Sequence, residues 1–111
     1  MITIKRKYID DMIDHSRRES PNECCGILAG RDGEVSKIFR VRNSAPSPYR
    51  YIMDPREMME VMRETDRQGI DLMAFYHSHT HSPAYPSDTD TRMALESGWV
   101  DFTYVLVSLE D

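Results

Sequence analysis

The sequence has few cysteines and no long apolar run. Its two cysteines, Cys24 and Cys25, are adjacent, and such a pair does not make a disulfide framework. No stretch is long and apolar enough to cross a bilayer. The segment Met1–Lys5 lacks the apolar core of a signal peptide. These absences exclude a disulfide-rich secreted scaffold and predict a reducing, cytoplasmic setting with no membrane partner.

The chain also lacks an excess of positive charge. Its net charge is −5, and the largest basic cluster, Lys5–Lys7, is too short to form a patch. Nucleic-acid-binding domains usually present a basic face, so we expect no nucleic-acid partner. With 111 residues, of which 40 % are hydrophobic, we expect a single domain over residues 1–111 with one core.

Hydrophobic periodicity and turn residues divide the chain into helices and strands. The predicted helices cover residues 7–20, 54–68 and 87–97. The predicted strands cover residues 24–29, 34–41, 49–53, 72–76 and 103–109. We expect strands 24–29 and 34–41 to form a hairpin through a turn at 30–33, and a polar loop at 77–86. This order predicts an α/β sandwich around one mixed sheet.

The second predicted helix has the clearest local signals. Asp54 can cap it, Pro55 suits its first position, and Glu57 would complete a capping box. Gly69 can adopt the left-handed conformation that ends a helix. One face of this helix would carry Met58, Val61, Met62 and Thr65.

Three of the four histidines lie within six residues, directly after the most apolar predicted strand. In an extended chain His77 and His79 point the same way, so they can present two imidazoles to one metal ion. A catalytic zinc needs a third protein ligand. Asp88, Asp90 and His81 are candidates. Asp90 is preferred because the first turn of a helix favours a carboxylate and holds it rigidly.

A metal held by these groups would keep a net positive charge and lower the pKa of a bound water molecule. Hydrolysis then needs a base that is not itself a ligand. Glu23, at the start of the first predicted strand, is the best distant candidate.

Each feature has a second interpretation. His77 and His79 could belong to a solvated loop, Ser87–Asp90 could be a helix cap, and Glu23 could lie in a turn. His15 is expected to be solvated on the polar face of the first helix. Cys25 is expected to be a small buried hydrophobe. Three methionines of the second helix are expected in the core: Met58, Met59 and Met62.

The joint occurrence of these features favours a metal site. The spacing H-x-H-x7-S-x-x-D, from His77 to Asp90, matches the signature of the JAMM (MPN-plus) zinc peptidases. The segment Glu23–Gly30 resembles the first core strand of that family and includes its glutamate. Tyr49–Pro55 resembles the entry into its second helix. The resemblance is to the compact prokaryotic form, because the insertions of eukaryotic deubiquitinases are absent.

The resemblance implies a cytidine-deaminase-like, three-layer α/β/α sandwich with one zinc ion per chain. It implies that His77, His79 and Asp90 hold the zinc, that Glu23 is the catalytic general base, and that Ser87 donates to the oxyanion. It implies hydrolysis of the amide bond after the C-terminal Gly-Gly of a ubiquitin-like or sulfur-carrier protein.

The sequence departs from the family in two places. Thr80 stands where the family often has proline, which removes no ligand. Family domains usually continue past the position of Asp111, so the domain could lack its C-terminal end.

Two substrates and one other class of function compete. The bond cut could be a lysine isopeptide or a short adduct, such as a single cysteine, on a sulfur carrier; the compact architecture favours the adduct. The alternative is a non-catalytic MPN scaffold, against which the intact set of site residues argues. Zinc deaminases use a C-x-x-C pair, which this chain lacks. The sequence does not determine the oligomeric state.

Overall fold

The described part of the fold consists of two helices, each followed in sequence by two strands of one sheet. The computed structural model describes residues 2–80 and 103–109. Its elements are α1 (Arg6–Glu19), β1 (Cys25–Arg31), β2 (Glu34–Val41), α2 (Pro55–Gln68), β3 (Asp71–His79) and β4 (Thr103–Ser108). The predicted third helix, at 87–97, lies outside the described residues. Along the residues described, no helix combines the length and apolarity needed to cross a membrane.

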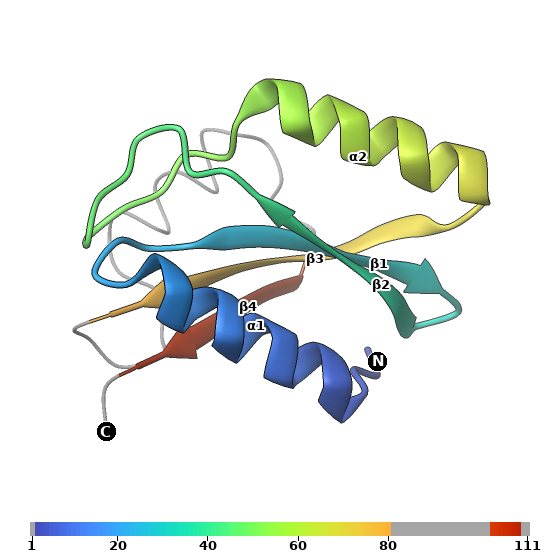
Figure 1. Ribbon diagram of the computed structural model, residues 1–111. Coiled ribbons are helices and arrows are strands. Elements are labelled where there is room, and N and C mark those ends of the chain that lie inside the picture. The colour runs from blue at the N-terminus through green and yellow to red at the C-terminus, as the bar shows by residue number, and fades with distance from the viewer. Residues whose placement is uncertain (1, 81–102, 110–111) are drawn as a thin grey trace.

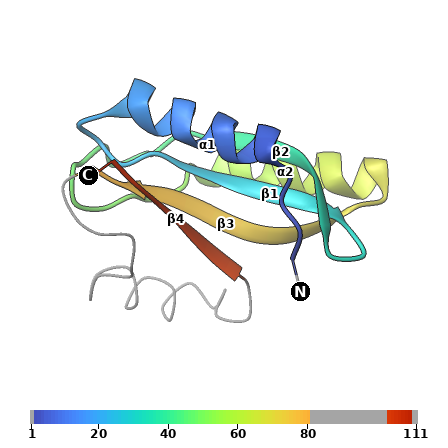
Figure 2. The ribbon, with the colours of Figure 1, turned by 90° about the horizontal axis from the view of Figure 1, so that it is seen from below.

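The four strands form a mixed sheet in the order β2-β1-β3-β4. Strand β1 is antiparallel to both β2 and β3, whereas β3 and β4 are parallel. Figure 1 shows α2 over one face of the sheet and α1 over the other, and Figure 2 shows α1 in front of the sheet when it is seen from below. The predicted three-layer α/β/α sandwich with a mixed sheet is confirmed.

Alternation along the central strands supplies a separate core to each helix, because successive side chains of a strand point to opposite faces. The core on the α1 side includes Met12, Cys24, Leu28, Val35, Ala74 and Tyr76. The core on the α2 side includes Cys25, Ile27, Val41, Met53, Val61 and Phe75. Strands β1 and β3 are therefore buried on both faces, as their near-continuous apolar runs predict.

Two glycines and one aspartate meet steric demands of the sheet. The β1–β2 hairpin turns at Asp32 and Gly33, whose φ angles are 56° and 78°. Two successive positive φ angles are typical of the two-residue turn that matches strand twist. A Cβ at Gly26 would lie 2.1 Å from Cε2 of Tyr76, so only glycine lets this ring lie across β1.

The start of α2 confirms the predicted cap but not the capping box. Oδ1 of Asp54 accepts hydrogen bonds from the backbone N–H groups of Arg56 (2.9 Å) and Glu57 (3.3 Å). The Glu57 carboxylate instead accepts the backbone N–H of Arg42 at 2.8 Å. It therefore ties the helix to the end of β2. Gly69 ends the helix with a φ of 68°, as predicted.

Two strand predictions were wrong in extent. Residues 49–53 form no strand; only Met53 makes an isolated bridge, to Asn43. The reason is that the backbone of this segment bonds to the Asn43 side chain. Strand β3 continues to His79, three residues beyond its predicted end, because β1 pairs with it as far as His77 and β4 as far as His79.

The expectation that α2 buries its methionines was also wrong. Met59 is 55 % exposed and Met62 is 41 % exposed, whereas Met58 is partly buried. Val61 and Thr65 are the buried residues of the helix. The buried stripe of α2 is therefore narrower than its apolar sequence suggests.

His15 is buried rather than solvated, which corrects a further expectation. It lies on the stripe of α1 that faces the sheet, with Met12 and Ser16. Its Nδ1 atom is 2.8 Å from the Tyr76 hydroxyl. The polar partner offered by Tyr76 is what allows an imidazole at this buried position.

Acidification is therefore expected to destabilise the fold through His15. Burial, followed by the charge of Arg40, lowers the pKa of His15 below its usual 6.5, while nearby carboxylates oppose the shift less strongly. The unfolded chain then binds a proton that the folded chain resists. This contribution to stability is complete above pH 6.5 and is lost as the pH falls from 6.5 toward the lower folded-state value.

Thermal unfolding measured from about pH 8 down to about pH 5 checks this expectation. Tm should fall with pH in the wild type and fall less in His15→Gln, which keeps a polar group near Tyr76. Equal slopes of Tm against pH in the two proteins would show that the acid-sensitive group is not His15.

Candidate catalytic site

The two predicted histidine ligands lie together at the end of β3. His77 and His79 both point to the face covered by α2, on which Phe75 also lies. Their ring centroids are 5.2 Å apart and their planes are inclined by 59°. They are 2 % and 3 % exposed, so the pair is buried rather than part of a solvated loop.

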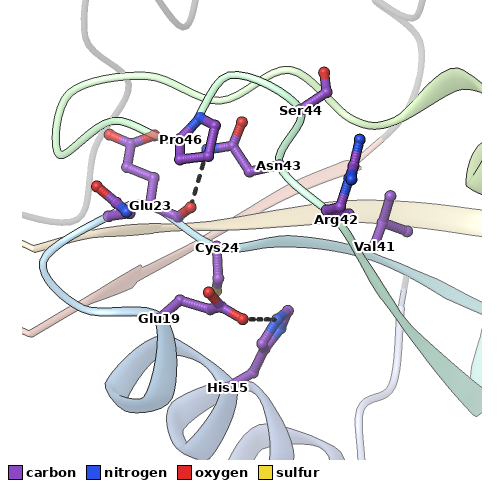
Figure 3. A pocket seen from close by; sticks show the side chains of 10 residues that line it. His15, Glu19, Glu23, Cys24, Val41, Arg42, Asn43, Ser44 and Pro46 are labelled. Carbon is purple, nitrogen blue, oxygen red and sulfur yellow. Dashed lines mark hydrogen bonds and ion pairs between the residues drawn. The ribbon is translucent and has the colours of Figure 1, made fainter.

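Glu23 reaches the same end of the sheet from the strand next to β3. Cys25 lies directly opposite His77 in the β1–β3 pairing. One residue earlier, the N–H of Ser78 donates to the carbonyl of Cys24 at 3.1 Å. Extending this register places Glu23 opposite His79. Glu23 is 4 % exposed, and Figure 3 shows its carboxylate pointing away from α1.

Side-chain hydrogen bonds reinforce this junction. The Ser78 hydroxyl accepts the backbone N–H of Cys24 at 2.8 Å. The Thr80 hydroxyl donates to the carbonyl of Pro21 at 3.0 Å. Thr80, where the family often has proline, thus fastens the end of β3 to the segment before Glu23. These roles were not anticipated from the sequence, because serine and threonine carry no signal for so distant a partner.

An aromatic ring covers one of the histidines. Tyr51, from the loop between β2 and α2, stacks on His77 with ring centroids 4.5 Å apart and planes inclined by 30°. This contact was also missed, since residues 49–53 were expected to form a strand. It restricts how the His77 ring can turn.

A cavity of about 310 Å³ borders the Glu23 segment. Figure 3 shows that α1 contributes to one side of it and the loop after β2 to the other. Its lining residues are His15, Glu19, Asn22, Glu23, Cys24, Val41, Arg42, Asn43, Ser44 and Pro46. Neither His77 nor His79 is among them.

The donor set suits a zinc ion as far as it is described. Two imidazoles two residues apart on one strand face supply nitrogen ligands of the type that zinc prefers. Within residues 2–80 and 103–109 no third histidine, cysteine or carboxylate completes a group of three. The predicted third ligand, Asp90, lies outside the described residues, as do its alternatives Asp88 and His81.

The two cysteines do not compete for a metal. Cys24 packs toward α1, and Cys25 is fully buried with its thiol donating to the carbonyl of Val41 at 3.4 Å. Burial raises the pKa of both thiols, which keeps them protonated and inert. The expectation that Cys25 is a small buried hydrophobe is confirmed.

Comparisons with known proteins identify the family. A family model described as prokaryotic homologs of the JAB domain matches residues 5–111. The chain belongs to this family. The predicted resemblance to the JAMM family in its prokaryotic form is thereby confirmed.

Several relatives have named activities. The CysO-cysteine peptidase of Mycobacterium tuberculosis is 36 % identical over 113 residues, covering 100 % of this chain and 75 % of the relative. A probable TtuB-protein conjugate cleaving protease of Thermus thermophilus is 35 % identical over 95 residues, covering 85 % of this chain and 64 % of the relative. A desampylase of Haloferax volcanii is 33 % identical over 106 residues, covering 89 % of this chain and 74 % of the relative.

Solved structures share the fold. The solution structure of protein DSY2949 from Desulfitobacterium hafniense has a TM-score of 0.87 and 35 % identity, covering 100 % of this chain and 77 % of that one. The crystal structure of AF2198, a JAB1/MPN domain protein from Archaeoglobus fulgidus, has a TM-score of 0.64 at 14 % identity, covering 97 % of this chain and 79 % of that one. At that identity the second likeness concerns the fold alone.

Proposed function

We propose that this protein is a zinc-dependent peptidase that hydrolyses the amide bond after the C-terminal Gly-Gly of a ubiquitin-like or sulfur-carrier protein. The observation that carries the proposal is the meeting of Glu23, His77 and His79 at one end and on one face of the sheet, each less than 5 % exposed. Burying a carboxylate and two imidazoles costs free energy, and buried titratable groups of this kind cluster at catalytic sites. The relatives named as peptidases support the same class of reaction.

The chain's own residues have distinct roles in this proposal. His77 and His79, with Asp90, would hold the zinc, and Ser87 would donate a hydrogen bond to the developing oxyanion. When bound, zinc would act as a Lewis acid that makes a water molecule more acidic. Glu23 would accept a proton at its carboxylate and deliver it to the leaving amine. Tyr51 would hold the His77 ring in orientation through stacking.

The substrate we favour is a short adduct, such as a single cysteine, on a sulfur-carrier protein. The relative with 36 % identity is named for a CysO-cysteine substrate, and the sequence lacks the insertions of eukaryotic deubiquitinases. A lysine isopeptide is the competing substrate, supported by the relatives named for protein conjugates. Both of the chain's cysteines are free, which fits the proposed cytoplasmic location.

Mass spectrometry on a panel of Gly-Gly adducts tests the proposal. The zinc-loaded protein should release the group attached to the terminal glycine, fastest from the carrier–cysteine adduct. Faster cleavage of a lysine isopeptide would reverse the order of the two substrates. Tight binding of a carrier without cleavage of any adduct would instead support the non-catalytic scaffold.

Specificity is expected to lie on the glycine side of the cut bond. An extended tail can approach a sheet by strand addition, with backbone hydrogen bonds providing the grip. Only glycine passes close to a buried centre without a side-chain clash. Replacing the last glycine of the carrier by leucine should abolish cleavage in the mass-spectrometric assay. Equal rates with the two carriers would refute this basis of specificity.

A further inference from the structure

Asn43 uses its whole hydrogen-bonding capacity in contacts around the candidate site. Its Nδ2 atom donates to the carbonyl of Glu23 at 3.1 Å and to that of Arg50 at 3.2 Å. Its Oδ1 atom accepts the backbone N–H of Ala45 at 3.1 Å and that of Ile52 at 3.0 Å. An amide side chain has two donor hydrogens and two acceptor lone pairs, so all four are engaged.

These bonds clamp the peptide groups of Glu23 from the loop side. The Asn43 amide holds the Glu23 carbonyl, as the dashed line in Figure 3 shows. The N–H of Glu23 donates to the carbonyl of Ser47, in the same loop, at 2.8 Å. The backbone of Glu23 is thus bonded on both sides to residues 43–47. The direction of its carboxylate depends on how this loop is folded.

The same loop carries the ring that stacks on a predicted metal ligand. Tyr51 lies between Arg50 and Ile52, whose backbone groups both bond to the Asn43 side chain. Its ring centroid is 4.5 Å from that of His77. Asn43 therefore connects the residue that carries the proposed base to the aromatic cover of the histidine pair.

We propose that Asn43 is a positioning residue that holds Glu23 and Tyr51 in fixed relation to His77. The expected effect on turnover rests on the proposed function, whereas the expected effect on the conformation of Glu23 and Tyr51 does not. It acts through backbone groups and does not itself touch the reacting atoms. Misplacing a catalytic group by about 1 Å can lower a rate by about a hundredfold, so a clamp of this kind matters to turnover.

The neighbouring residue offers a matched control. The Ser44 hydroxyl donates to the carbonyl of Ile52 at 3.1 Å, and the Ser44 backbone N–H donates to the same carbonyl at 2.8 Å. Ser44→Ala therefore removes one side-chain bond from the loop and leaves every bond to Glu23 in place. Asn43→Asp keeps the size and both acceptor positions but loses both donors, one of which holds Glu23.

Two measurements on the full chain separate positioning from general loop stability. The first is amide hydrogen exchange, in which protection of the Glu23 N–H should fall about tenfold in Asn43→Asp and stay unchanged in Ser44→Ala, while the amides of β1 and β3 keep their protection. The second is turnover of the carrier–cysteine adduct. There kcat should fall about ten- to a hundredfold in Asn43→Asp, with KM changed less than about threefold.

Wild-type protection and kcat in Asn43→Asp would overturn the proposal, and so would equal losses in both variants. Should Asn43→Asp lose protection throughout the sheet, the uncharged Asn43→Ser variant is measured in its place, with the same expectations. If the wild type cleaves no adduct, the proposed function fails, while the exchange measurement still decides the positioning role. A loss of protection at the Glu23 N–H that occurs only in the Asn43 variant supports that role. Unchanged protection there refutes it.

Discussion

Glu23→Gln is expected to retain one zinc per chain while its kcat falls by about 10²–10⁴-fold. Glutamine keeps the size and much of the hydrogen bonding of glutamate but cannot accept a proton. The loss corresponds to roughly 3–5 kcal/mol of transition-state stabilisation. Zinc should remain because Glu23 is not one of the proposed ligands. A fourth protein ligand would close the open position that catalysis needs.

The experiment pairs a zinc count with the rate of cleavage of a Gly-Gly adduct. Glu19→Gln is the matched control, because Glu19 borders the same cavity as Glu23 but lies on α1, beside His15. That variant should keep both zinc and kcat. Loss of zinc in Glu23→Gln would make Glu23 a ligand. A near-normal kcat would move the base elsewhere, with Asp88 the next candidate.

His77→Ala is expected to reduce zinc to well below one per chain and to abolish turnover. Removing one of two imidazoles from the strand destroys the chelate, leaving His79 with one carboxylate from another part of the chain. Losing the ion also removes the positive charge that would make a bound water molecule more acidic. Because Tyr51 loses its stacking partner, circular dichroism is needed to show that the variant still folds.

Metal analysis of parallel variants separates the ligands from their neighbours. His81→Ala should keep full zinc, since His81 is not part of the predicted set. Asp90→Asn should lose zinc and Asp88→Asn should keep it, which decides between the two carboxylates. Undiminished zinc in folded His77→Ala protein would refute the ligand assignment.

Local signals were sufficient for most of the secondary structure. The cap at Asp54 and the stop at Gly69 were predicted because both depend on contacts within a few residues. The prediction of a strand at 49–53 was wrong because this segment depends on contacts with residues further away in the sequence. Its backbone partners belong to the Asn43 side chain, a contact that no alternation of apolar residues can reveal. The predicted end of β3 was wrong because pairing with β1 and β4 extends the strand into a segment whose sequence is polar.

The candidate site divides in the same way. The sequence alone predicted that the two imidazoles point the same way, because residues two apart in an extended chain lie on one face. That β3 extends through both histidines depends on its pairing with β4. The sequence also indicated Glu23, through the match to a family pattern. Only the tertiary structure decided that Glu23 lies beside these histidines, because the pairing of Cys25 with His77 joins segments about fifty residues apart.

The supports of the site belong wholly to tertiary structure. The bonds of Asn43 to Glu23 and of Ser78 to Cys24, and the stacking of Tyr51 on His77, join side chains to partners that are distant in sequence. The burial of His15 against Tyr76 is of the same kind. Sequence patterns indicate which local structure a segment can form and which face each of its side chains occupies. Which of them meet across the sheet follows from strand order and register, which the packing of the whole chain selects.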